Sequence, residues 1–295
     1  MAADIIVFAN QKGGVGKTIT VSATASILHS RGKRVLMINL DAQRNLDMVA
    51  GDHIAISRSD TSQKNIMTVL NGECELRDAI VSTNIGDLAR ATNQLYAWTG
   101  IDLITEEEFE ERENDPAAVM ELLRRRIKLK KNTDAHILEK KLQAVLDDYD
   151  YILIDTNPTL TLLTTNALYA ANYVVIPAFS ERSSAEAVIE LYESIQSIKY
   201  FNPGKKLEIL GLLMTKFDPR SRAGKRHIEA YQAMTKQMGI HLFEAKIRVS
   251  ARAAEYVEAG EDIVNYDPTG NTTQDYNQFV DELIKEIAKH KEVTT

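Results

Sequence analysis

The sequence predicts an α/β protein built on a doubly wound, mostly parallel sheet with helices on both faces. Short apolar runs, typical of buried parallel strands, alternate along the chain with stretches of helical spacing. Two of these runs end in an aspartate, at the edge where such sheets bind ligands. We therefore expect a single domain over residues 1–295, with a ligand site at the carboxyl ends of its strands.

Composition narrows the class of protein. Of the 295 residues, 44% are hydrophobic and 26% are charged, as in ordinary soluble domains. Cys74 is the only cysteine, which excludes a disulfide framework and favours a cytoplasmic location. The chain enters an apolar run almost at once, so we expect no signal peptide, and no run of about 18 apolar residues could span a membrane.

The distribution of charge is uneven. The net charge of −7 argues against nucleic-acid binding over the whole surface. Residues 199–252, however, hold 12 Lys and Arg against 4 Asp and Glu. This asymmetry indicates a basic face on an acidic body.

The first strand and helix enclose a glycine-rich turn. Residues 5–9 form an apolar run, and residues 17–30 have helical character. Gly13, Gly14 and Gly16 lie between them and allow backbone N–H groups to converge on phosphate oxygens, beside the positive end of the helix. The alternative is a glycine turn without a ligand. The predicted nucleotide ligands here are Gly13, Gly14, Val15, Gly16, Lys17 and Thr18.

Three side chains near this turn predict a metal site. The Thr18 hydroxyl is expected to hold Mg²⁺, and Lys17 to reach the β- and γ-phosphates. The run 34–40 ends at Asp41, which could join the Mg²⁺ shell or orient an attacking water. The run 151–155 ends in Asp155, which is typical of a Walker-B carboxylate. The alternatives are that Asp41 caps the next helix and that Asp155 is structural.

Three motifs resemble one family. The segment Lys12–Thr18 resembles the deviant phosphate loop of the ParA/MinD ATPases, with Gln11 where the usual first glycine stands and an additional lysine, Lys12. Residues 41–45 resemble the family's switch-I motif, Asp-x-Gln-x-Asn, and residues 155–158 its Asp-x-Pro-Pro motif with Asn157 in place of one proline. The resemblance is weakest over residues 51–148.

The resemblance implies an activity. It implies a P-loop NTPase with a deviant Walker A motif that uses ATP and Mg²⁺ and hydrolyses ATP. It also implies an ATP-dependent homodimer in which Lys12 crosses to the partner's nucleotide, so the expected catalytic residues are Lys12, Lys17 and Asp41. The chain resembles the short class, and we expect no N-terminal DNA-reading domain.

Cations in the C-terminal half of the chain predict a DNA-binding surface. Residues 219–226 carry four cations and read as a loop suited to phosphate backbones. Arg220 matches an arginine that in the family helps to bind double-stranded DNA without sequence preference, and residues 247–255 resemble a second family segment. The alternative is an ordinary solvated surface. The candidate DNA-binding residues are Arg220, Arg222, Lys225, Arg248 and Arg252.

The resemblance also implies partners. A ParB-type centromere-binding protein is expected to stimulate hydrolysis, and the ATP-bound dimer is expected on the nucleoid. The alternatives are a MinD-like regulator recruited to membranes and a scaffold ATPase that positions another cargo. The apolar stripe of residues 276–287 reads as core and lies among acidic residues, so we expect no membrane partner.

The remaining elements follow from periodicity. Residues 66–70 and 76–80 read as short helices, and residues 101–105 as a strand. The charged stretch 106–131 is a solvated helix or a second partner surface. Longer helices are expected at 160–171 and 184–199, and strands at 173–177 and 208–215. Met214 and Thr215, at the end of the last of these strands, are candidate walls for adenine.

Overall fold

The computed structural model of the protein describes residues 2–41, 46, 66–82, 89–91, 135–179, 181–250, 255, 256 and 263–294. The described strands form one sheet in the order β3-β4-β2-β5-β1-β6-β7-β8. Neighbouring strands are parallel except β3 and β4, which are antiparallel. The predicted fold class is therefore confirmed. The strands are β1 (Asp4–Phe8), β2 (Val35–Leu40), β3 (Ile80–Ser82), β4 (Ala89–Ala91), β5 (Tyr151–Thr156), β6 (Tyr173–Phe179), β7 (Glu208–Phe217) and β8 (Leu242–Arg248).

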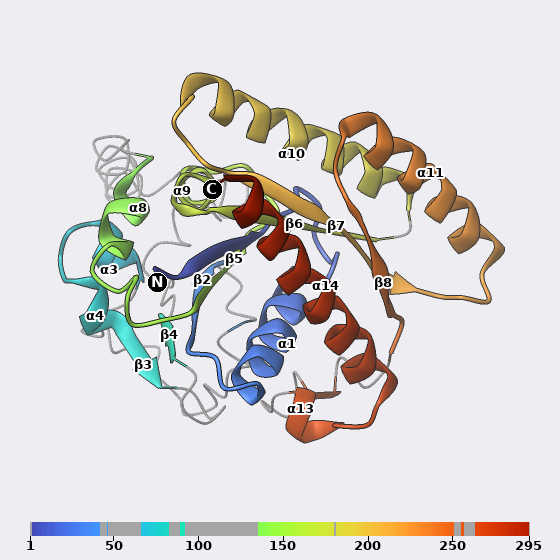
Figure 1. The fold of residues 1–295 in the computed structure, drawn as a ribbon, viewed down its shortest axis with the longest axis horizontal. Coiled ribbons are helices and arrows are strands. Elements are labelled where there is room, and N and C mark those ends of the chain that lie inside the picture. Colours follow the sequence, from blue (N-terminus) through green and yellow to red (C-terminus); the bar gives the residue numbers. More distant parts are fainter. Residues whose placement is uncertain are drawn as a thin grey trace, which may run out of the picture.

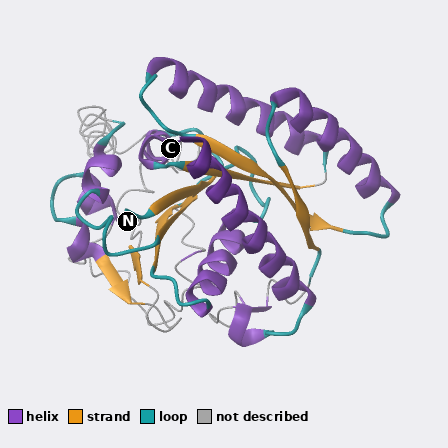
Figure 2. Cartoon of the chain, in the orientation of Figure 1, coloured by secondary structure: helices purple, strands orange, loops and turns teal. Residues whose placement is uncertain are grey.

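Helices cover both faces of this sheet (Figures 1 and 2). One hydrophobic cluster joins the sheet to α1, α13 and α14, and the other joins it to α3, α4, α8, α9, α10 and α11. Burial on both faces explains why the central strands are mostly apolar. The helices are α1 (Lys17–Ser30), α3 (Ile66–Leu70), α4 (Leu76–Ala79), α8 (Ile137–Leu142), α9 (Leu162–Ala170), α10 (Arg182–Phe201), α11 (Arg222–Met238), α13 (Ile263–Tyr266) and α14 (Asn271–Thr294).

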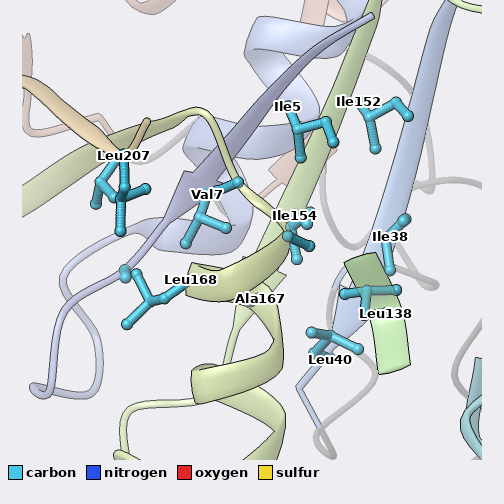
Figure 3. Packing of buried hydrophobic residues seen from close by; sticks show 14 of the residues in the cluster. Ile5, Val7, Ile38, Leu40, Leu138, Ile152, Ile154, Ala167, Leu168 and Leu207 are labelled. Atoms are coloured by element: carbon cyan, nitrogen blue, oxygen red, sulfur yellow. The ribbon is translucent and has the colours of Figure 1, made fainter. Parts of the chain in front are cut away.

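The alternation of side chains along β1 divides the core. Ile5 and Val7 point to the α9 face, where Figure 3 shows Ile5 beside Ile152, and Val7 close to Ile154 and Leu168. Ile6 and its strand neighbour Phe8 belong to the cluster on the α1 face. Because β1 is buried on both sides and lies between β5 and β6, its carboxyl end has a fixed position in the middle of the sheet.

That position is the topological switch point of the sheet. From β1 the chain passes to β2 on one side of it, whereas β6, β7 and β8 follow on the other side. Open parallel sheets bind ligands in the crevice at such a point, outside the carboxyl ends of the strands. The glycine-rich turn that follows β1 is therefore placed where a ligand site is expected.

The C-terminal half differs from the sequence-based expectation in one element. Residues 219–226 were expected as a loop, but α11 begins at Arg222, where the Ser221 hydroxyl accepts a hydrogen bond from Gly224 N at 3.1 Å. Serine is a favoured residue at this capping position, and the signal is present in the sequence. The predicted strand 101–105 and the charged stretch 106–131 lie outside the described residues. Among the helices that are described, none is long and apolar enough to cross a membrane.

Candidate nucleotide site

The glycine-rich turn has the backbone of a phosphate loop. Gly14 and Gly16 have φ values of 73° and 83°, in the left-handed region that favours glycine. A Cβ atom built on Gly13 or Gly14 would meet nothing within 4 Å, so the outer surface of the turn is open. Gly16 caps α1, and no side chain among the described residues bonds the N–H groups of its first turn. This arrangement suits an anion.

Hydrogen bonds to β6 and β7 hold the turn in place. Asn10 donates from Nδ2 to the carbonyl oxygen of Pro177 at 2.7 Å, and its Oδ1 accepts from Lys12 N at 3.0 Å. Thr215 donates its hydroxyl to the carbonyl oxygen of Val15 at 2.7 Å. Both anchoring side chains are buried, so the turn is fixed to two neighbouring strands.

Lys17 is folded into the loop. Its ammonium donates to the carbonyl oxygens of Asn10 and Lys12, each at 3.2 Å, and the residue is only 6% exposed. Burial lowers the pKa of the Lys17 ammonium, while the charges of Asp155 and Asp41 act in the opposite direction. The loop thus holds a cation at its centre, close to two carboxylates.

Asp155 and Thr18 meet at the end of β5. Asp155 lies opposite Phe8 and Asn39 in the sheet and is fully buried. Its Oδ2 accepts a hydrogen bond from the Thr18 hydroxyl at 2.7 Å, whereas Oδ1 is buried without a hydrogen-bond partner among the described residues. Burial raises the pKa of this carboxyl to about 7.

These residues fit a divalent cation. An unsatisfied buried carboxylate oxygen is costly, and a hydroxyl with carboxylate oxygens is the ligand set that Mg²⁺ prefers. Asp41 lies near enough to influence both Lys17 and Asp155 electrostatically, and its N–H is bonded to Asn39 Oδ1 at 2.9 Å. The structure therefore brings Lys17, Thr18, Asp41 and Asp155 together at the carboxyl ends of the strands, and their roles as ligands stay a prediction.

Lys12 is placed differently from Lys17. Its ammonium forms an ion pair with Glu181 Oε2 at 2.7 Å, and the two side chains are 25% and 51% exposed. Lys12 therefore lies at the rim of the loop and Lys17 at its centre. The Lys12 side chain stays partly exposed there, in contrast to that of Lys17.

The two candidate adenine walls have other contacts. Met214 is fully buried in the hydrophobic cluster on the α9 face. Thr215 uses its hydroxyl to hold the loop through Val15. Neither side chain presents an exposed surface, and the adenine contacts stay a prediction.

The candidate DNA-binding cations differ in their surroundings. The Arg220 side chain is 92% exposed, at 3.5 Å from Asp218. Arg248 instead pairs with Asp275, with Nη2 at 2.6 Å from Oδ1 and Nε at 2.9 Å from Oδ2, which raises the pKa of its guanidinium. Arg222 and Lys225 belong to the first turns of α11, and Arg252 lies outside the described residues. In this structure Arg220 is thus the most accessible candidate whose side chain is described.

Known proteins resemble this chain over nearly its whole length. A family model described as "AAA domain" (AAA_31) matches residues 3–209. The sporulation initiation inhibitor protein Soj of Bacillus subtilis is 31% identical over 96% of this chain and 98% of its own. The chain belongs to the ParA-type ATPases of the ParA/MinD superfamily.

Two further comparisons agree with this family. The chromosome partitioning protein ParA of Myxococcus xanthus is 30% identical, over 95% of this chain and 88% of its own. A crystal structure of a putative plasmid partition protein from Borrelia burgdorferi bound to AMPPNP has the same fold, with a TM-score of 0.72 at 22% identity over 96% of this chain and 99% of that one. As a ParA-type protein the chain is an ATPase, with ATP and Mg²⁺ as its cofactors, as the sequence predicted.

Sequence reasoning missed two residues of this ParA-type site. Asn10 bonds the carbonyl of Pro177, and Glu181 bonds Lys12, across separations of 167 and 169 residues. Local patterns do not indicate pairings at such separations. A polar residue directly after a buried strand was the only available signal, for Asn10.

Proposed function

We propose that this ParA-type ATPase is a DNA-partition protein whose ATP-bound homodimer holds double-stranded DNA without sequence preference. One observation carries the proposal. Lys17 is buried at the centre of its own loop, whereas Lys12 lies at the rim with a partly exposed ammonium. Two lysines in one short loop therefore have different neighbours, and the outer one can serve the nucleotide of a second subunit.

Within one protomer the proposed roles follow the geometry. The backbone N–H groups of Gly13, Gly14 and Gly16, with the Lys17 ammonium, bind the phosphates of ATP. Thr18 and Asp155 would hold Mg²⁺, which neutralises phosphate charge when bound. Asp41 orients the attacking water as a nearby carboxylate.

Between protomers, Lys12 is proposed to act in trans. Its ammonium neutralises charge that develops on the partner's phosphates during hydrolysis, as an arginine finger does. Closure of the dimer requires bound ATP because the triphosphate lies between the two loops. Hydrolysis breaks the bond between the β- and γ-phosphates, and once the inorganic phosphate leaves, the charge that Lys12 contacts is gone and the subunits separate.

DNA binding is proposed to depend on the dimer. Each subunit contributes an exposed cation at Arg220, supported by Arg222 and Lys225 of α11 and by Arg252. One such patch is weak, but two linked patches bind a duplex together with a high effective local concentration. Arg248 contributes less, because its guanidinium is paired with Asp275.

Partner and location follow from the same proposal. A ParB-type centromere-binding protein stimulates hydrolysis and so releases the dimer from DNA. The protein is cytoplasmic and is associated with the nucleoid only while ATP is bound.

Co-sedimentation with a random-sequence duplex tests this function. ATP with Mg²⁺ is expected to cause sedimentation, ADP or no nucleotide is not, and higher salt weakens the complex. Arg220→Ala is expected to lower affinity equally for all sequences and to reduce the salt slope. Lys206→Ala removes another exposed cation, which precedes β7 and so lies at the opposite end of that strand from Arg220, and serves as the control.

Two outcomes contradict the proposal. The first is sedimentation that does not depend on nucleotide. The second is ATP-dependent binding to anionic liposomes without binding to DNA, which would instead indicate a membrane-recruited regulator.

A further inference from the structure

Glu181 is the residue directly before α10, but its side chain does not cap the helix. It occupies the capping position with φ −141° and ψ 153°, yet its carboxylate makes no capping hydrogen bond to the helix. The nearby Ser184 hydroxyl is bonded to Phe179 N at 3.1 Å. The Glu181 carboxylate extends instead to the Lys12 ammonium at 2.7 Å.

The backbone of Lys12 is fixed independently of this contact. Its N–H bonds Asn10, which in turn bonds Pro177 of β6, and its carbonyl accepts from Lys17. The side chain can therefore exchange one anionic neighbour for another while the loop keeps its shape. Rotation about side-chain bonds is sufficient for such an exchange.

We propose that Glu181 holds Lys12 within its own protomer. This contact raises the protein concentration at which two nucleotide-bound copies associate. This inference rests on the proposed trans role of Lys12. Before Lys12 reaches the phosphates of a second copy, its ammonium must leave Glu181. Glu181 is thus a positioning residue that acts through Lys12 and opposes closure of the dimer.

The size of the effect follows from exposure. A partly exposed ion pair contributes little, about threefold in an equilibrium constant. A twofold-symmetric dimer breaks one such pair in each subunit, so the combined effect is on the order of tenfold. That is small enough for nucleotide to overcome and large enough to measure.

The test is the dissociation constant of the dimer of Glu181→Gln, measured by sedimentation velocity with Mg²⁺ and AMPPNP. The amide keeps the shape and removes the charge, and the dissociation constant is expected to fall on the order of tenfold. The difference between the dissociation constants of the native chain and Glu181→Gln is expected to shrink as the salt concentration rises, because salt screens the native ion pair. Glu190→Gln makes the same change of charge on an exposed position of the same helix, and it corrects for general repulsion between acidic protomers.

Glu181→Asp provides a second variant with the charge retained on a shorter side chain. It is expected to give a dissociation constant between those of the native chain and Glu181→Gln. A dimer of unchanged or lower affinity in Glu181→Gln, with Glu190→Gln also unchanged, overturns the inference.

Lys12→Ala separates this inference from the proposed function. If Lys12→Ala forms dimers with native affinity, the trans role fails and the inference fails with it. If Lys12→Ala binds nucleotide but does not dimerise, while Glu181→Gln behaves like the native chain, only the role of Glu181 fails. The double variant is expected to match Lys12→Ala, because Glu181 acts through Lys12.

Discussion

The hydroxyl of Thr18 donates to one oxygen of the Asp155 carboxylate at 2.7 Å, and the other oxygen of that carboxylate is buried without a hydrogen-bond partner among the described residues. The first turn of α1 and the end of β5 are joined by this bond. The remaining oxygen is one that a divalent cation could satisfy. Three predictions concern this site, and a fourth concerns the ion pair between Arg248 and Asp275.

Asp155→Asn is expected to remove the response to Mg²⁺ and to stabilise the metal-free chain above neutral pH. In the folded native chain burial raises the pKa of Asp155 to about 7 from an ordinary value of 3.8. The folded chain favours the protonated, neutral carboxyl. The contribution of this group to the free energy of unfolding is therefore full below the ordinary pKa and is lost as pH rises through about 7.

Thermal unfolding in EDTA at pH 6 and pH 8 measures this effect. The native chain should lose more stability between the two values than Asp155→Asn does. Asp150→Asn, before the other end of β5, is the control. A fully native Mg²⁺ response in Asp155→Asn would exclude this carboxylate as a ligand.

Lys17→Ala is expected to weaken ATP binding by at least about tenfold, because a charged hydrogen bond to phosphate contributes about 1.5–3 kcal/mol. Titration with a fluorescent ATP analogue measures the dissociation constant. Lys33→Ala, an exposed cation beyond the other end of α1, should bind as the native chain does. Tight binding by Lys17→Ala would refute the phosphate role.

Thr215→Val is expected to loosen the loop. The two side chains have the same shape, but the variant leaves the carbonyl of Val15 without its 2.7 Å donor, at a cost of about 1–2 kcal/mol. Nucleotide affinity should fall several-fold and urea stability should decrease.

A second buried threonine provides the matched control. Thr235 bonds the carbonyl of Tyr231 within α11, so Thr235→Val should leave nucleotide affinity unchanged. Equal affinities for Thr215→Val and the native chain would show that the anchor is dispensable.

Arg248→Ala is expected to affect stability more than DNA binding. The ion pair with Asp275 joins the end of β8 to α14 and is partly exposed, so its loss costs about 1 kcal/mol. The melting temperature should fall by a few degrees. DNA affinity should stay within about twofold of native, in contrast to Arg220→Ala. A loss of DNA affinity as large as that of Arg220→Ala would show that Arg248 belongs to the DNA-binding surface.

Local patterns were sufficient for much of the fold and for the centre of the site. The strand, glycine turn and helix at residues 5–30 are contiguous, and Asp41 and Asp155 each follow a buried apolar run, so their convergence at one sheet edge follows from parallel pairing. The short strands β3 and β4 have three residues each, too few for a period to be recognised.

Other features depended on tertiary contacts. A family pattern alone assigned Arg248 to DNA, whereas its pairing with Asp275 on α14 depends on packing. The neighbours of Lys12 could not be predicted either, because Glu181 is brought to it only when β6 lies beside β1. The expected domain extent, 1–295, stays a prediction, as does the role of Arg252, which lies outside the described residues.

The anchoring of the glycine turn has a consequence for synthesis on the ribosome. The turn is translated early, but its supports Pro177 and Thr215 are added 167 and 200 residues after the residues that they bond. A nascent chain that ends before β6 therefore carries the complete signature motif without the walls that shape it. The loop can bind nucleotide only late in translation. Truncated chains that end before β6 are therefore expected not to bind ATP.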